Sequence, residues 1–180
     1  KELCNLIRES GLISGCEWTV EVAPNEITEE KLEALLKGGV NRLSLGVQTL
    51  DPVFMKELGR KHSVSNAFDA FRLSREAGFQ SINLDLIFGA PGQELIDWQD
   101  DLRKVVQLDP DHISTYCLTF EEDTALFAKL AQGKVSIDPE REAAFYEWAW
   151  GYLPSQGFEQ YEVSNYAKTG KECRHNLNTW

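Results

Sequence analysis

Short apolar, β-rich runs alternate along this chain with longer stretches in which apolar residues recur at helical spacing. Such alternation is typical of repeated βα units built around a parallel sheet. We predict four strands, over residues 16–23, 42–49, 81–88 and 112–119. The fold class is therefore predicted to be α/β, with about four parallel βα units.

Caps and apolar stripes predict the helices between these strands. Thr28 is a suitable N-cap, and Asp51 precedes a proline that can occupy the first helical position. Trp148 and Trp150 fall on the last helix, and we assign them to the hydrophobic core. Because the chain starts on a helix, further strands of the sheet are expected to precede Lys1. The predicted helices cover residues 1–10, 28–37, 65–77, 94–108, 124–132 and 139–153, with a short one from Asp51.

Residues 157–167 are predicted to be extended and to leave the βα repeat, and the last residues contain no clear finishing element. We therefore predict one barrel-like domain over residues 1–156 and the start of a C-terminal region over 157–180. With 180 residues and 42% hydrophobic content, the chain can bury a sizeable core.

Acidic residues outnumber basic ones by 29 to 18, which gives a net charge of -11. A chain of this charge is repelled by nucleic-acid phosphates and by anionic membranes, so we expect no nucleic-acid partner. No apolar run reaches the ~18 to 20 residues of a membrane helix, and no signal-peptide core is present. We therefore expect no transmembrane segment and a cytoplasmic location.

The four cysteines lie far apart, without the short gaps of a zinc or cluster site. We expect Cys4, Cys16 and Cys117 to be buried or half-buried thiols, and we expect no metal site within these residues.

Polar residues lie near the ends of three predicted strands: Glu21, Gln48, and Asn83 with Asp85. In parallel βα folds, ligands collect at the carboxyl ends of the strands. Side chains alternate along a strand, so Ser44 and Gln48 face one way, as do Asn83 and Asp85. This pattern predicts a polar face opposite a face packed on helices. The alternative is a structural network in which these groups hydrogen-bond one another.

Arg60 lies in a polar loop after the second strand, within reach of the same edge. Its guanidinium could hold a carboxylate, while Glu21, Gln48 and Asp85 suit hydroxyls and an amine. Schiff-base chemistry is disfavoured because every lysine falls on a predicted helix or loop. There is no GxGxxG motif, P-loop or G-x-S-x-G elbow, and the three histidines are too scattered for a metal triad.

Five motifs follow one another along the chain: NRLSLGVQTLD (41–51), LGRKH (58–62), INLDLIFGAPGQ (82–93), HISTYCLT (112–119) and YEVSNYAKTGKECRHNLNTW (161–180). Together they resemble the radical S-adenosylmethionine (SAM) family of oxygen-independent coproporphyrinogen III oxidase-like proteins. The ending in particular is similar to the heme chaperone branch of that family.

The resemblance implies a partial (βα)6 TIM-like barrel that binds SAM and a 4Fe-4S cluster. By motif, Glu21, Gln48, Arg60 and Asp85 match the SAM-contacting positions of the family. A backbone contact is also expected near residues 117–119.

Two departures from the family pattern bear on activity. The family's CxxxCxxC cluster motif and its GGGTP segment are absent here, and both would precede Lys1. Without the cluster, SAM is not reductively cleaved, so this stretch alone is not expected to be catalytic. The branch's terminal HNxxYW motif is HNLNTW here, with Thr179 in place of tyrosine.

Within that ending, the resemblance makes His175 a candidate axial heme ligand, since imidazole binds heme iron. Tyr166 and Trp180 could stack on a porphyrin, and Cys173 is a weaker candidate ligand. The alternative is a histidine that packs the end of the barrel.

Three functions remain open. The first is a heme chaperone that binds SAM, a 4Fe-4S cluster and heme, with a heme-recipient protein and a reductant protein as partners. The second is an oxygen-independent coproporphyrinogen III oxidase of porphyrin biosynthesis. The third is a non-catalytic binding module on the same fold.

Overall fold

A computed structural model describes residues 2–11 and 15–179 of the chain. Its six strands form one open sheet in the order β1-β2-β3-β4-β6-β5. The first four strands pair in parallel, and β6 and β5 add antiparallel at one edge. The strands are β1 (Thr19–Val22), β2 (Arg42–Gln48), β3 (Ile82–Phe88), β4 (His112–Cys117), β5 (Glu159–Gln160) and β6 (Asn165–Ala167).

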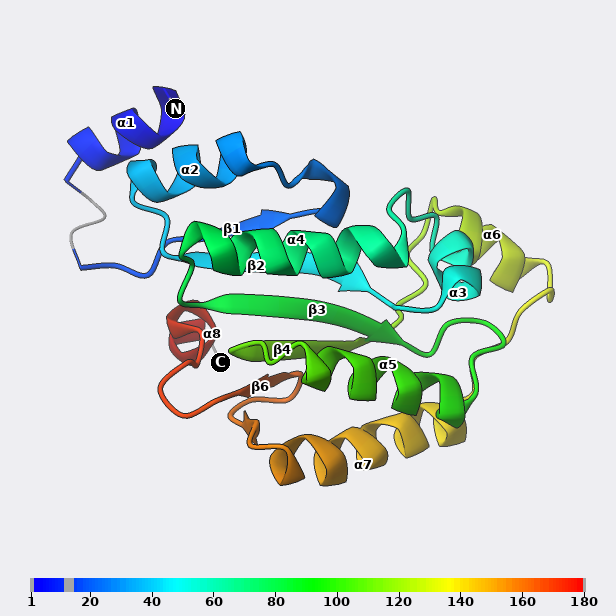
Figure 1. The fold of residues 1–180 in the computed structure, drawn as a ribbon. Coiled ribbons are helices and arrows are strands. Elements are labelled where there is room, and N and C mark those ends of the chain that lie inside the picture. Colours follow the sequence, from blue (N-terminus) through cyan, green and yellow to red (C-terminus); the bar gives the residue numbers. More distant parts are fainter. Residues whose placement is uncertain (1, 12–14, 180) are drawn as a thin grey trace.

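The helices α2, α4, α5 and α7 lie on one side of this sheet (Figure 1). The shorter helices α3 and α6 lie at one end of the strands, and α8 lies at the other end (Figure 1). The helices are α1 (Glu2–Glu9), η1 (Pro24–Glu26), α2 (Glu29–Gly38), α3 (Pro52–Glu57), α4 (Val64–Ala77), α5 (Leu95–Gln107), α6 (Ala125–Ala131), α7 (Pro139–Ser155) and α8 (Arg174–Thr179). The α/β class with four parallel strands is confirmed, and the sheet is unclosed, as in a partial TIM-like barrel.

The predicted caps form as hydrogen bonds. The side chain of Thr28 accepts from the backbone amide of Lys31 at the start of α2. The Asp51 carboxylate accepts from the amides of Val53 and Phe54 at the start of α3. These bonds satisfy amides that the first helical turn leaves without an intrahelical partner.

The hydrophobic core lies between the sheet and the helical layer. Strand residues of the helix-covered face are almost fully buried, namely Leu43, Leu45, Leu84, Leu86, Phe88 and Ile113. Trp98 of α5 has no exposed surface, and its indole nitrogen donates to the carbonyl of Phe145 on α7 across 3.1 Å. Its ring centre lies 5.2 Å from that of Phe88. Trp98 therefore joins β3, α5 and α7.

Four expectations need correction. The first strand is shorter than 16–23, because its pairing with β2 begins only at Thr19. Cys16 is exposed, whereas Cys4 and Cys117 are partly buried as expected. Trp150 is 49% exposed because α7 buries the stripe of Phe145, Ala149 and Leu153 instead.

The fourth correction concerns the end of the chain, where residues expected to lack a finishing element form α8. Residues 157–167 are extended as expected, and they contribute β5 and β6 to the same sheet. No helix among the described residues is long and apolar enough to cross a membrane.

Candidate functional site

The sheet face opposite the core holds a cluster of polar side chains. The Ser44 hydroxyl donates to Oδ2 of Asp85 (2.8 Å), and the Asn83 amide donates to Oδ1 of Asp85 (2.7 Å) and to Ser44 (2.7 Å). The predicted alternation is therefore confirmed for Ser44, Asn83 and Asp85. The alternative interpretation, a structural network, is confirmed for the same three residues, because they hydrogen-bond one another.

Asp85 is the acidic centre of this cluster. Burial raises its pKa, against the hydrogen bonds of Ser44, Asn83 and Ser114, and the negative charge of Glu21 raises it further. A buried carboxylate held in this way gains most from a ligand that brings a positive charge or hydroxyl donors. Glu21 is exposed on β1 and pairs in register with Ser44. Glu21 and Asp85 thus belong to the same polar face.

Gln48 and Arg60 meet at the carboxyl end of β2. Nη2 of Arg60 donates to Oε1 of Gln48 across 3.0 Å. Gln48 adopts a left-handed backbone conformation with φ of 70°, where the β2–β3 register shifts between Leu45 and Gln48. Arg60 is exposed and is free to turn the rest of its guanidinium toward a ligand. The structure therefore places Glu21 and Asp85 on the polar face of the sheet, and the pair of Gln48 and Arg60 at the carboxyl end of β2.

Gln93 fixes the turn that follows β3. Its side chain is fully buried, and its Oε1 accepts from the amides of Gly89 (2.8 Å) and Ala90 (3.2 Å). Sequence reasoning treated this segment only as a strand breaker. The bonds hold the loop at the same strand edge as Asp85.

Asp101 is a second positioning residue that sequence reasoning missed. Its carboxylate accepts from the Thr49 hydroxyl (2.5 Å) and from the Leu50 amide (3.1 Å), directly after Gln48. A signal for it existed, because Asp101 interrupts the apolar stripe of α5 between Trp98 and Val105. A carboxylate at a core-facing position has to bind a partner across the fold.

Asp101 is expected to make stability depend on pH. Burial raises its pKa from 3.8 to about 6. The stabilising effect of the neutral carboxyl is therefore complete below pH ~4 and is lost as the pH rises through ~6, a change of about 3 kcal/mol. We expect the free energy of unfolding, relative to Asp101→Asn, to fall by about 2 to 3 kcal/mol between pH 4 and 7 in urea titrations. Parallel pH curves for the two proteins would contradict this prediction.

The polar network continues from Asn83 toward the opposite end of the strands. His112 Nδ1 lies 2.6 Å from Oδ1 of Asn83, and His112 Nε2 lies 2.6 Å from the Tyr161 hydroxyl. Burial lowers the pKa of His112 to about 2, so the imidazole is neutral. Since the Asn83 oxygen can only accept, Nδ1 donates, and Nε2 accepts from Tyr161. The Tyr161 oxygen also accepts from Asn176 of α8 across 3.2 Å.

His175 lies at the amino ends of the strands, away from the four strand-end residues. Its helix α8 is held by the Arg174 amide, which donates to Glu17 just before β1 (3.0 Å), and by Asn176 on Tyr161. β2 has seven residues, so its amino and carboxyl ends lie about 20 Å apart. The structure therefore does not bring His175 together with Gln48 and Arg60 (Figure 1).

The candidate heme-binding side chains differ in their exposure to solvent. The His175 side chain is exposed. Tyr166 has no exposed surface, so its predicted stacking on a porphyrin is wrong for this structure. Cys173 is buried, its thiol donates to Glu17, and burial raises its pKa, which disfavours the thiolate that would ligate iron. Trp180 lies outside the described residues.

The motifs imply two cofactors at the barrel, SAM and a 4Fe-4S cluster, and the described side chains suit only the first. The strand-edge carboxylates, amide and guanidinium fit the hydroxyls, amine and carboxylate of SAM. Within residues 2–11 and 15–179, no three His, Cys, Asp or Glu side chains gather to hold a metal. The described residues thus offer no ligand set for a 4Fe-4S cluster.

A partial α/β barrel with polar groups at the carboxyl ends of its strands is the arrangement of a cofactor-binding barrel. Residues 1–105 match the family described as the Radical SAM superfamily. The chain belongs to the radical SAM superfamily.

Several curated proteins are similar to this chain over most of its length. The chain is 40% identical over 165 residues to the heme chaperone HemW of Bacillus subtilis, covering 91% of this chain and 44% of that protein. It is 37% identical over 171 residues to HemW of Escherichia coli, covering 94% and 44%. The radical S-adenosyl methionine domain-containing protein 1, mitochondrial, of Danio rerio is 37% identical over 174 residues, covering 96% and 39%.

Among solved structures, the chain resembles coproporphyrinogen III oxidase (HemN) from Escherichia coli, which is a radical SAM enzyme. The TM-score is 0.81 at 28% identity, and the match covers 95% of this chain and 40% of that one. An archaeal Elp3 from Methanocaldococcus infernus shares the fold at 23% identity, with a TM-score of 0.70 over 77% of this chain and 33% of that one. The chain thus spans less than half the length of these relatives.

Proposed function

We propose that this chain is the central and rear part of a radical SAM barrel in a heme chaperone-like protein. The identity of 34 to 40% to several proteins named HemW supports this reading. Residues 1–156 would form the barrel portion, and residues 157–180 would begin a C-terminal region. A heme-recipient protein, a reductant protein and a cytoplasmic location belong to the same proposal.

SAM would bind at the carboxyl edge of the sheet. Arg60, already oriented by Gln48, would hold the ligand carboxylate, and Glu21, Gln48 and Asp85 would bind its hydroxyls and amine. The 4Fe-4S cluster, held by cysteines outside this chain, would supply the electron that cleaves SAM. These four residues would orient SAM. The Asp101 clamp, which is the pair of hydrogen bonds that Asp101 accepts from Thr49 and Leu50, would keep the end of β2 in place.

Heme would bind at the opposite edge, with His175 of α8 as the iron ligand. The placement of α8 at the amino ends of the strands supports the chaperone rather than the oxidase. An oxidase has to hold its porphyrin substrate against SAM for reaction. A porphyrin at His175 would lie a strand length, about 20 Å, from the Gln48 edge and would be carried rather than converted.

Removing the His175 imidazole is expected to weaken heme binding. In the full-length protein, His175→Ala should lower heme affinity by about tenfold or more and shift the Soret band, because the axial bond is lost. Asn178→Ala, at an exposed position of the same helix, is the matched control and should bind like wild type. Unchanged spectra and affinity in His175→Ala would remove the ligand assignment.

The function itself is tested with the full-length protein, reconstituted anaerobically with iron and sulfide. It is given SAM, a reductant and coproporphyrinogen III, while porphyrins and 5′-deoxyadenosine are followed together. We expect SAM cleavage without porphyrin conversion. Formation of protoporphyrinogen would establish the oxidase instead, and absence of cleavage would favour the non-catalytic module.

A further inference from the structure

A pocket of about 350 Å³ opens at the amino ends of the strands, beside α8. Three cationic side chains line it: Arg42 at the start of β2, Lys171, and Arg174 at the start of α8. This edge is opposite the one that carries Gln48 and Arg60. The pocket therefore belongs to neither the SAM-binding proposal nor the His175 ligand itself.

Arg42 is an unusual residue at the base of this pocket. Its side chain is only 2% exposed, and its Nη1 donates to the Ser81 hydroxyl across 3.2 Å. Its buried Nε has no hydrogen-bond partner. Within the described part of the chain, no carboxylate lies within 4.0 Å of its guanidinium. A buried guanidinium without a counter-ion costs free energy that an anionic ligand would offset.

Besides the two arginines, the charged side chains that line the pocket are Lys171, Glu17 and Glu172, and each has a hydrogen-bond partner. Lys171 donates to the Gln80 carbonyl (2.5 Å) and lies 3.6 Å from Asp111. Glu17 accepts from the Arg174 amide (3.0 Å) and from the Cys173 thiol (3.3 Å).

Among the described residues, the Arg174 guanidinium donates only to a backbone carbonyl, that of Gly15 (3.3 Å). Glu172 accepts from the amide of Gly170 (3.3 Å). Arg42 and Arg174 are thus the two guanidinium groups of the pocket whose charge is not matched by a described carboxylate within ion-pairing distance. Two guanidinium groups that line one pocket suit a ligand that carries carboxylates, because each guanidinium can donate two parallel hydrogen bonds to a carboxylate.

We propose that this pocket holds the propionate carboxylates of a heme bound at α8. The inference rests on the proposed heme-binding function and adds a subsite to it. Arg174, which lines the pocket, directly precedes His175, and Leu177 on the same helix is an apolar side chain that is 54% exposed. Helix α8 thus carries an imidazole that can bind heme iron and an apolar side chain that can contact the macrocycle. It also borders the pocket whose two guanidinium groups can bind the propionates.

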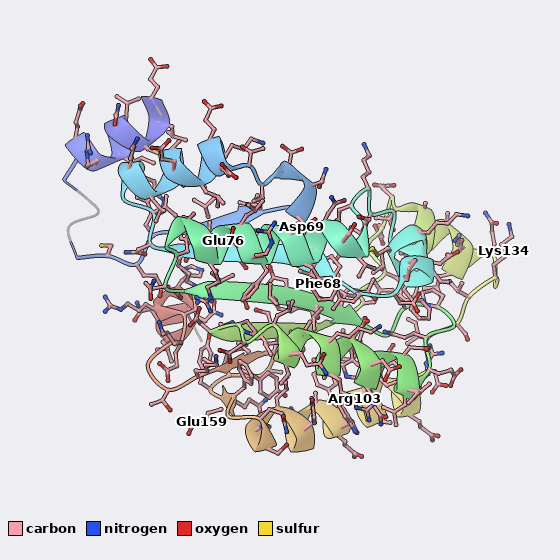
Figure 2. The ribbon with its side chains drawn as sticks, in the orientation of Figure 1. Phe68, Asp69, Glu76, Arg103, Lys134 and Glu159 are labelled. Atoms are coloured by element: carbon pink, nitrogen blue, oxygen red, sulfur yellow. The ribbon has the colours of Figure 1, made fainter. Side chains whose placement is uncertain are left out.

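The test compares hemin with hemin dimethyl ester, whose propionates are neutral, on the full-length protein. Wild type is expected to bind hemin at least tenfold more tightly than the ester. Arg42→Met and Arg174→Gln should lose most of this preference while binding the ester like wild type. Arg103→Gln, an exposed arginine on α5 in the helical layer, is the control and should keep the full preference (Figure 2).

Each outcome of this comparison either supports the propionate subsite or overturns it. Equal binding of hemin and ester by wild type overturns the subsite while leaving heme binding standing. A preference that survives in both pocket variants also overturns it. If wild type binds neither porphyrin, the proposed heme function fails and the subsite fails with it. Should Arg42→Met not fold, the wild-type comparison and Arg174→Gln still decide, because Arg174 is exposed.

Discussion

Asp85→Ala in the full-length protein is expected to weaken SAM binding by about 30-fold or more. An uncompensated charge in a buried polar site costs ~2 to 5 kcal/mol, and the ligand loses this carboxylate as a partner for its amine or hydroxyls. Arg60→Ala should weaken binding by about tenfold, less than Asp85→Ala because Arg60 is exposed. Isothermal titration with SAM, with the cluster in place, measures both.

A stability measurement separates binding from folding in this experiment. Burial raises the pKa of Asp85, so folding is less favourable with this carboxyl ionised than with it neutral. Asp85→Asn, which removes the charge and keeps the shape, should therefore unfold at neutral pH with a free energy no lower than that of wild type, yet bind SAM poorly. Asp69→Ala, at an exposed position on α4, is the matched control (Figure 2). Wild-type SAM affinity in Asp85→Ala and Arg60→Ala would refute the assignment of this edge.

Trp98→Ala is expected to lower the free energy of unfolding by about 3 to 5 kcal/mol. Trp98 has no exposed surface, contacts Phe88 of β3 at 5.2 Å between ring centres, and donates to the Phe145 carbonyl of α7. The substitution leaves a cavity between three elements and a carbonyl without its partner. Urea unfolding measures the change, which corresponds to a fall in Tm of about 10 °C in a chain of this size.

Trp150→Ala is the matched control, since it removes the same side chain from a position that is 49% exposed. Its expected effect is below about 1 kcal/mol. Equal losses of stability in the two variants would contradict the packing described here, in which α7 faces the core through Phe145, Ala149 and Leu153.

Local patterns in the sequence predicted most of the secondary structure. Strands β2, β3 and β4 lie within the predicted ranges, and α2 and α3 begin after the predicted caps Thr28 and Asp51. The errors fall where neighbours in space decide the outcome. Residues 16–18 do not join β1 because its pairing with β2 starts at Thr19. Trp150 is exposed because the apolar stripe of α7 that meets α5 lies elsewhere on the helix.

The candidate SAM edge was also largely predictable. Strand alternation placed Ser44, Asn83 and Asp85 on one face, and they form one hydrogen-bonded group there. The Asp101 clamp was missed because its partners, Thr49 and Leu50, lie about fifty positions earlier in the chain. No periodicity encodes a contact of that separation.

The order of elements, the caps and the polar character of the strand ends can be read from local sequence, because these depend on residues a few positions apart. The position of α8 at the amino ends of the strands, opposite Gln48 and Arg60, emerges only in the folded chain. The same holds for the burial of Arg42 without a carboxylate among the described residues. Both features depend on the pairing and register of distant strands, where burial and charge are set by residues that meet only when the sheet assembles.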